Sequence, residues 1–514
     1  MALFRSIATV GGYTMVSRVL GFVRDVLVAA YLGAGPVADA FFVAFKFPNF
    51  FRRLFAEGAF NAAFVPMFAG KIATAGRTAA RLFAEDTLAV LLGVLVVLVI
   101  VIEAGMPWFI TLAAPGFAGD PEKFRLAVEF TRITFPYLLF ISLVSLQGGV
   151  LNSLDRFAAV AATPVLLNLC LIGALIGLVH RLPTAGHALA WGVAAAGVAQ
   201  FVWLAWACGR AGMGLSLPRP RLTPEVRRLL VLMLPAALGS GVVQVNLLID
   251  VVLASLLPTG AVSFLYYADR IYELPLAVIG IAIGTAILPV LSRQIRKSEH
   301  AAAVETQNRA LEAALLLTLP AAAALIVLDR PIIAVLFERG AFGSAEVGAT
   351  AAALAAYALG LPAYVLIKVL TPCFYAREDT RTPVKIAVGC VVVNTVVALA
   401  AMQLFAHVGI ALATVVSAWL NVGLLAAALR RRGYFAPDRR LRRRAPRVLL
   451  AAALMALVLW AVLPAFEPWL AAGTVRRSSA LAALILLGLA TYAATALVVR
   501  AADLEEVRRL FRRS

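Results

Sequence analysis

The hydrophobic pattern divides the chain into long apolar segments separated by short polar ones. A membrane-spanning helix needs about 20 mostly apolar residues, and fourteen segments reach roughly this length. They are 7–32, 37–68, 86–112, 125–151, 160–179, 187–208, 228–256, 263–291, 309–328, 346–375, 384–405, 409–429, 447–463 and 479–499. The second is too long for one straight helix, and we expect Pro48 and Gly58 to break it into an in-membrane half and an interfacial half. The pattern predicts an all-α polytopic membrane protein with fourteen transmembrane helices.

Composition supports this fold class. The 514 residues are 62% hydrophobic and 14% charged, whereas a soluble globular protein is about 45–50% apolar and about 25% charged. The loops are too short for a soluble catalytic domain, and no nucleophile–base constellation or phosphate-cradling glycine loop occurs. We therefore expect a transporter and not an enzyme. The four cysteines are isolated and no histidine has metal-ligand spacing, so we expect no metal cofactor beyond the sodium considered below.

The positive charge follows the membrane topology. A net charge of +19 would suggest nucleic acid as a partner in a soluble protein. Here one set of alternating loops holds 31 Lys and Arg and the other set holds 7. The positive-inside rule therefore places both termini in the cytoplasm, and no nucleic-acid partner is needed to explain the charge. The Arg-rich stretch 430–447 is the one marked shift in composition, and we expect it to contact lipid headgroups.

Two parts of the chain repeat one pattern. Asp25 in RDVLVAAYLGAG corresponds to Asp250 in IDVVLASLLPTG, and Lys46 corresponds to Arg270, with an offset of 223–227 residues throughout. Six spans separate the copies, and an even number gives a parallel repeat. The repeat predicts two parallel six-helix lobes around a central cavity, as in transporters. The predicted domains are the lobes 1–210 and 225–430, a cytoplasmic linker at 431–446, and two extra helices with a cytoplasmic tail at 447–514.

The first two spans contain charges that a lipid-facing helix could not carry. They are Arg18, Arg24, Asp25, Asp39, Lys46, Arg52, Arg53 and Glu57. A charge at the bilayer centre costs ~3 kcal/mol on insertion scales, so these side chains should face a polar cavity. One interpretation is a set of salt bridges that only hold helices together. The five bases outnumber the three acids, which favours the other interpretation, an anionic ligand.

The arginines among these charges suit a phosphate or pyrophosphate. Guanidinium groups bind phosphate oxygens bidentately and stay charged when desolvated. Arg18, Arg24 and Arg52 would form one wall, with Arg270 of the second lobe as their counterpart. The acids Asp25, Asp39, Asp269 and Glu273 would hold the arginines or pair with them in an empty site, and such pairs can act as gates. Glu57 follows Arg53 at i+4 and can pair with it.

Two isolated polar residues, Asp250 and Lys368, can each be interpreted in two ways. Asp250 is a lone carboxylate within a span. It is either a site of proton or cation coupling or a structural hydrogen-bonding group. Lys368 in VLIKVL either extends its ammonium to the membrane interface or contacts the cavity.

Several motifs together resemble a known family. They are the charged hairpin at 14–66, Asp-Arg-x-Tyr-Glu at 269–273, the loop FYAREDTRTPVK at 374–385 and the fourteen-span layout. They resemble the lipid II flippase family, MurJ or MviN, of the multidrug/oligosaccharidyl-lipid/polysaccharide exporter superfamily. The resemblance implies a flippase that moves lipid II, an undecaprenyl-pyrophosphate-linked peptidoglycan precursor, by alternating access for cell-wall synthesis. It implies movement from the cytoplasmic to the periplasmic leaflet of the bacterial inner membrane. The cell-wall synthesis machinery is a further candidate partner.

The resemblance also assigns roles to residues. It implies substrate contacts at Arg18, Arg24, Asp25, Asp39, Lys46, Arg52 and Arg270, and gate or salt-bridge roles for Ala29, Arg53, Glu57, Ser263, Asp269 and Glu273. Some members hold sodium, and Asp250, Asn394 and Thr414 fit that pattern. The second acid expected one turn after Asn394 is Ala398, so sodium, protons and the membrane potential all remain candidate drivers. The last two helices of such proteins form a groove thought to take the lipid tail.

Two other transport functions are consistent with the layout. A flippase for another polyprenyl-pyrophosphate-linked oligosaccharide would need the same basic cavity. An exporter of cationic drugs would need a net acidic cavity, whereas the charges counted here are net basic.

Overall fold

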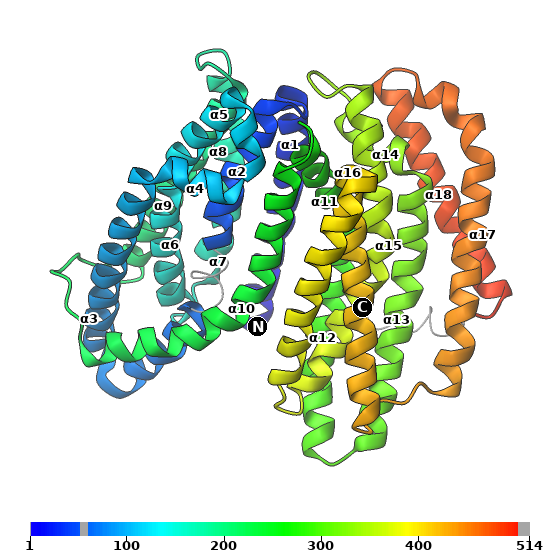
Figure 1. Cartoon of the computed structure of the whole chain (residues 1–514). Helices are drawn as coiled ribbons and strands as arrows, with labels where there is room; N and C mark the ends of the chain where they lie inside the picture. Colours follow the sequence, from blue (N-terminus) through cyan, green and yellow to red (C-terminus); the bar gives the residue numbers. More distant parts are fainter. Residues whose placement is uncertain (1, 52–59, 502–514) are drawn as a thin grey trace. The chain divides into compact units, whose positions relative to one another are not determined.

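The computed structural model describes residues 2–51 and 60–501, and every regular element in that part of the chain is a helix (Figure 1). The chain forms two compact units. The first consists of Met1–Ser263 together with Arg339–Phe342, and the second of Phe264–Glu338 together with Gly343–Ser514.

The first unit carries the charged hairpin and the helices that surround it. Its elements are α1 (Ala2–Leu32), α2 (Pro36–Phe51), α3 (Asn61–Ala104), α4 (Met106–Ala113), η2 (Pro115–Gly119), α5 (Pro121–Thr134), α6 (Tyr137–Asn152), α7 (Phe157–Ala161), α8 (Thr163–Leu178), α9 (Ala185–Arg210) and α10 (Pro224–Ser255). Helix α1 packs against α8, α2 against α5, and α6 and α8 against α9. Its interior includes the stacked rings of Phe64, Phe68 and Phe83, all nearly fully buried.

The second unit is built around α15, which packs against α12, α13 and α16. Its elements are α11 (Ala261–Pro275, which begins in the first unit), the π-helical turn η3 (Leu276–Gly280), α12 (Ile281–Arg296), α13 (His300–Val327), α14 (Asp329–Phe337), α15 (Ser344–Tyr375), α16 (Arg381–Arg431), α17 (Arg439–Leu470) and α18 (Thr474–Val498). Helix α15 has buried residues, most of them apolar, along its length from Val347 to Phe374, as expected for the centre of a helical unit.

The helices account for the fourteen predicted spans. Within the described residues, ten helices or helix pairs are long and apolar enough to cross a membrane. Helices α1 and α10 coincide with two further predicted spans, and α2 covers the first part of the predicted second span. Helix α16 contains 51 residues and is kinked at Ala406 (φ 48°, ψ −130°), so it covers the two spans predicted on either side of that residue. The chain is an all-helical polytopic membrane protein.

Some predicted boundaries were wrong. Helix α2 continues through Pro48 to Phe51, so Pro48 does not break it. Proline removes the N–H that would bond to the carbonyl four residues earlier. That carbonyl, of Ala44, instead accepts a hydrogen bond from the Thr134 hydroxyl of α5 at 3.4 Å. A hydroxyl on a neighbouring helix is one way in which a transmembrane helix tolerates an internal proline. Gly58 lies outside the described residues.

Helix α3 joins the end of the predicted second span to the third. It bends at Gly76, where φ is +82°, a conformation that glycine adopts without strain. It ends at Ala104, and the segment after Gly105 forms the separate helix α4 instead of continuing the span to residue 112.

The thirteenth predicted span starts earlier than expected. Helix α17 begins at Arg439, so much of the Arg-rich stretch is helical. Asp438 caps this helix by accepting a hydrogen bond from the Leu441 N–H at 2.6 Å.

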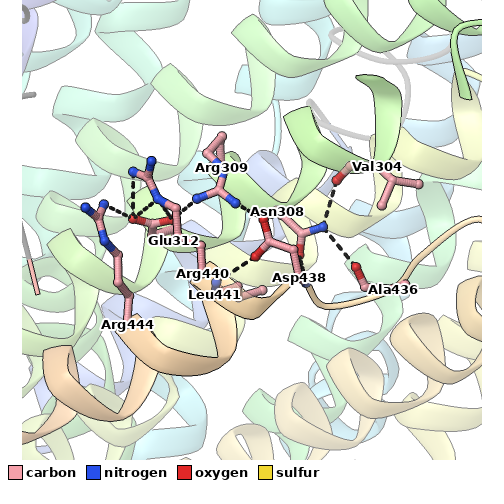
Figure 2. Close-up of polar contacts among 9 residues, drawn as sticks. All are labelled: Val304, Asn308, Arg309, Glu312, Ala436, Asp438, Arg440, Leu441 and Arg444. Carbon is pink, nitrogen blue, oxygen red and sulfur yellow. Dashed lines mark hydrogen bonds and ion pairs between the residues drawn. The ribbon is translucent and has the colours of Figure 1, made fainter. Parts of the chain in front are cut away.

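Figure 2 shows how the start of α17 is fastened to α13. The Glu312 carboxylate pairs with Arg309 on its own helix and with Arg440 and Arg444 on α17, while Asp438 pairs with Arg309. Asn308 donates to the Ala436 carbonyl at 2.9 Å. Further along the hairpin formed by α17 and α18, the Tyr492 hydroxyl donates to the Leu316 carbonyl at 2.7 Å. These contacts make the two C-terminal helices an integral part of the second unit.

Candidate functional site

Arg24 is held in place by two side chains. Its Nη2 lies 2.7 Å and its Nε 3.0 Å from Asp25 Oδ1, and its Nη1 donates to Asn168 Oδ1 at 2.9 Å. Asn168 in turn donates to the Ser17 carbonyl at 3.0 Å, so it bridges α8 and α1. Asp25 and Asn168 are both buried. Together they orient the guanidinium. Asp25 balances its single positive charge, and Asn168 is neutral.

Arg24 lines a cavity of about 360 Å³ between α1, α3, α6, α7, α8 and α9 of the first unit. The lining also includes the exposed side chain of Arg18, one and a half turns earlier on α1. Within the part of the chain that the structure describes, Arg18 has no ion-pair partner, whereas Arg24 is paired with Asp25. The cavity wall therefore carries a net positive charge, which favours an anionic ligand.

Asp39 occupies a different place from the two arginines. It is fully buried, and its carboxylate lies 2.9 Å from the Lys123 ammonium, which is only 4% exposed. It also accepts hydrogen bonds from the Gly260 N–H at 2.8 Å and from the Ser263 N–H and hydroxyl at 3.0 and 2.6 Å. These N–H groups lie just before and within the first turn of α11, where a carboxylate is favoured by the helix dipole. Asp39 on α2 thus connects the start of α11 with Lys123 on α5.

The C-terminal end of α1 is covered by the loop that joins α14 to α15. The Ala341 N–H donates to the Ala30 carbonyl at 2.8 Å. Gly33 and Gly340 have φ near +60°, and a Cβ atom on either would lie 2.3 or 2.2 Å from a backbone oxygen of the opposite segment. Glycine is therefore required at both positions. The predicted gate residues Ala29 and Ser263 are both completely buried.

In the second unit, Arg270 is paired with acids on its own helix. Its guanidinium lies 2.9 Å from Asp269 and 3.2 Å from Glu273, and it lies over the Tyr266 ring at 5.1 Å. All of these groups are partly or nearly fully buried on α11. The sequence predicted that Asp269 and Glu273 would hold or pair with an arginine, and both pairs with Arg270 are present in the structure.

The remaining predicted site residues lie in several places. Lys46 is half-buried on α2, while Arg52, Arg53 and Glu57 lie outside the described residues. Asp250 is half-buried on α10 of the first unit. Asn394 and Thr414 belong to α16 of the second unit, where Asn394 is fully buried and the Thr414 hydroxyl donates to the Ile410 carbonyl at 3.2 Å. No group of three or more His, Cys, Asp or Glu that could hold a metal occurs within the described ranges.

Lys368 packs its aliphatic stem across a glycine. A Cβ atom on Gly280 would lie 2.8 Å from its Cδ atom, so the gap left by this glycine accommodates the lysine stem. The Lys368 side chain as a whole is exposed. This arrangement is typical of a lysine that buries its stem and keeps its charge in a polar environment.

Two residues of this region were not found from the sequence. Asn168 is the only strongly polar side chain in the apolar helix TPVLLNLCLIGALIGL, and a lone polar residue within a span is a signal of function or of helix contact. Lys123 was counted only as a loop charge, because nothing in its local sequence indicates burial against Asp39.

Comparison with known proteins agrees with this fold. The family model described as "Lipid II flippase MurJ" matches residues 28–479. A "Probable lipid II flippase MurJ" of Rhizobium meliloti (strain 1021) is 48% identical over all of this chain and 97% of its own length. A protein of the same description from Rhizobium tropici is 44% identical with the same coverage.

Solved structures show the same similarity. "Lipid II flippase MurJ, inward closed conformation" superposes with a TM-score of 0.80 at 26% identity, over 96% of this chain and 98% of that one. An inward-facing multidrug resistance MATE family transporter of the MOP superfamily has a TM-score of 0.68 at 17% identity over 84% of this chain, which shows a shared fold alone. With a family model covering most of its length and relatives that match it from end to end, the chain belongs to the MurJ family of lipid II flippases.

Proposed function

We propose that this chain is a flippase that moves lipid II from the cytoplasmic to the periplasmic leaflet of the bacterial inner membrane for cell-wall synthesis. The observation that carries the proposal is the pair of arginines, Arg18 and Arg24, that line a cavity within the helices of a member of this family. Lipid II carries a pyrophosphate between its polyprenyl tail and its sugar, and arginine is the residue best suited to bind phosphate oxygens in a partly dry site.

The chemistry of Arg24 supports binding rather than catalysis. Asp25 and Asn168 fix the position of its guanidinium, so ligand binding does not have to order this side chain and loses less conformational entropy. Arg18 supplies a cation that has no acidic partner among the described residues. The resemblance in sequence adds Arg52, Arg270 and Lys46 as proposed contacts of the pyrophosphate.

Alternating access is proposed as the mechanism of movement. The lobes 1–210 and 225–430 would be its moving parts, and Ala29 and Ser263 would belong to its periplasmic gate, where Ser263 donates a hydrogen bond to Asp39. The bonds of the buried Asp39 carboxylate to Lys123 and Ser263 support this proposal, because such charge-assisted bonds would form or break as a group. Sodium at Asp250, Asn394 and Thr414, protons and the membrane potential are all consistent drivers.

The orientation rests on the loop charges. The excess of Lys and Arg in one set of alternating loops favours cytoplasmic N- and C-termini. The cell-wall synthesis machinery would then meet the product on the periplasmic side.

A flippase for a different polyprenyl-pyrophosphate-linked oligosaccharide is the alternative, because it would use the same arginines. Depletion of the chain in its host separates the two. The proposal predicts that lipid II accumulates on the cytoplasmic leaflet and that the cells then lyse. Normal lipid II distribution, with another polyprenyl-linked sugar accumulating instead, would favour the alternative.

A further inference from the structure

The cavity beside Arg18 and Arg24 has a second wall that a pyrophosphate would not use. Apart from the two arginines, the polar residues that line the cavity are all neutral. They are Ser17, Asn61, Tyr137, Ser145, Asn152, Thr163, Asn168 and Gln200. Aliphatic side chains, among them Ile141, Val144 and Leu167, fill the spaces between them. Its volume of about 360 Å³ is that of a small-molecule pocket and exceeds what one anion needs.

Part of this neutral wall is fixed by its own hydrogen bonds. The Tyr137 hydroxyl lies 3.2 Å from Gln200 Oε1, and Gln200 donates to the Thr163 carbonyl at 2.7 Å. Tyr137 and Gln200 are each only 2% exposed. These groups form a rigid surface beside the open part of the cavity.

Another part presents polar groups to the cavity. Ser145 is partly exposed on α6, and its hydroxyl accepts a hydrogen bond from Asn61 Nδ2 at 3.2 Å. Asn152, the last residue of α6, is half-buried in the same lining. Among the described residues its side-chain amide has no hydrogen-bond partner, so it can offer both a donor and an acceptor to a ligand.

We propose that this wall, centred on Ser145 and Asn152, binds the N-acetylated sugar that is attached to the pyrophosphate of the substrate. The inference rests on the proposed function and adds the recognition of the head group to it. An acetamido group has one N–H and one carbonyl, which match an asparagine amide and a serine hydroxyl in donors and acceptors. The sugar is bonded directly to the pyrophosphate, so a pyrophosphate at Arg18 and Arg24 brings it to this wall.

The lining disfavours the charged peptide part of the head group. A peptide carboxylate would compete with the pyrophosphate for the two arginines, and the described lining offers no acidic side chain to a peptide ammonium. Neutral hydroxyl and amide groups next to aliphatic surface are instead typical of a site for an uncharged polar ring.

The test measures equilibrium binding of the purified full-length chain in detergent to three lipids. They are undecaprenyl pyrophosphate, undecaprenyl-pyrophosphoryl glucose and undecaprenyl-pyrophosphoryl N-acetylglucosamine. Ser145→Ala and Asn152→Ala should each weaken binding of the N-acetylated lipid about 3- to 10-fold, the effect of one lost hydrogen bond. The affinity for undecaprenyl pyrophosphate should stay unchanged, and the affinity for the glucose lipid should fall less than the affinity for the N-acetylated lipid.

Matched control variants lie nearby on the same chain. The hydroxyls of Ser142 and Ser153 donate to the Leu138 and Gly149 carbonyls, both at 2.8 Å, and neither residue lines the cavity. Ser142→Ala and Ser153→Ala should bind all three lipids as the unmodified chain does. Equal loss for all three lipids in the cavity variants, or no loss for the N-acetylated lipid, would overturn the inference. Binding of undecaprenyl pyrophosphate by the unmodified chain would still support the proposed function. If the unmodified chain bound none of the lipids, the proposed function itself would fail, and the inference with it.

Discussion

The carboxylate of Asp39 and the hydroxyl of Ser263 form a 2.6 Å hydrogen bond in a fully buried site, although the two residues are 224 positions apart in the sequence. Lys123 completes the site from α5 at 2.9 Å. The Asp39 carboxylate is therefore paired with the Lys123 ammonium and hydrogen-bonded to N–H groups at the start of α11, in a site that excludes water. Because removing one partner from such a pair leaves the other buried and unpaired, this site should respond sharply to mutation.

Asp39→Asn removes one charge of this pair. It leaves the Lys123 ammonium, 4% exposed, without a counter-charge, and we expect the chain to lose stability on the scale of about 3–5 kcal/mol. Thermal unfolding of the purified protein in detergent measures the loss as a lower midpoint. Combining Asp39→Asn with Lys123→Met should recover much of it, because neither charge then remains. A double variant no more stable than Asp39→Asn would show that the ion pair is not the cause.

Gly340→Ala tests the loop that covers the end of α1. The added Cβ atom would lie 2.2 Å from the Ala30 carbonyl oxygen, in addition to the strain of a positive φ. We expect a clear fall in the unfolding midpoint and loss of the Ala341–Ala30 hydrogen bond, seen as faster amide exchange of Ala341.

Gly212→Ala is the matched control for that variant. Gly212 has φ +71° but nothing within 4 Å of an added Cβ atom, so its substitution introduces the backbone strain without the clash. That strain is worth about 1–2 kcal/mol. Equal effects of the two substitutions would mean that the close approach to Ala30 contributes nothing.

Glu312→Gln tests the fastening of α17 shown in Figure 2. The substitution removes the carboxylate that pairs with Arg440 and with the buried Arg444, which is 8% exposed. We expect lower thermal stability and increased protease access to 430–447. In the control Glu225→Gln, the lost pair with Lys71 is at the surface, where Glu225 is 51% exposed, so an effect of about 0–1 kcal/mol is expected. A Glu312→Gln variant as stable as the control would refute the fastening role.

The loop between α15 and α16 should respond to acid. Hydrogen bonds from Arg432 and Thr382 lower the pKa of Asp379 from 3.8 to about 2. Since the folded pKa lies below the unfolded one, the unfolded chain binds more protons in this range, and stability rises with pH. The contribution is complete above about pH 4 and is lost as the pH falls through about 2.

Asp379→Asn should remove this part of the pH dependence. Thermal unfolding between pH 2 and pH 5 measures it, with Asp155→Asn in the loop after α6 as a control that should keep the dependence of the unmodified chain. An unchanged pH profile in Asp379→Asn would exclude this ion pair as its source.

The spans could be predicted from the sequence because each depends on a local property, the length of an apolar segment. The charged residues at Arg18 and Arg24 could be selected for the same reason: a charge within a span has few explanations. Pairings between distant segments were not accessible in this way. The Asn168–Arg24 bond joins residues 144 positions apart, and the Lys123–Asp39 pair requires α5 to pack on α2. The continuation of α2 through Pro48 likewise depends on Thr134 of another helix.

The most direct test of the proposed function is the leaflet distribution of lipid II in host cells that depend on an Arg24→Ala variant. Arg18→Ala is the parallel variant on the same wall, and Thr14→Ala, whose exposed hydroxyl donates to the Val10 carbonyl of its own helix, is the control. Membrane levels of each protein are matched before lipid II is measured. If the two arginines bind the pyrophosphate, lipid II should stay in the cytoplasmic leaflet with Arg24→Ala and Arg18→Ala, and should reach the periplasmic leaflet with Thr14→Ala. Normal periplasmic lipid II with both arginine variants would contradict a pyrophosphate site at Arg18 and Arg24.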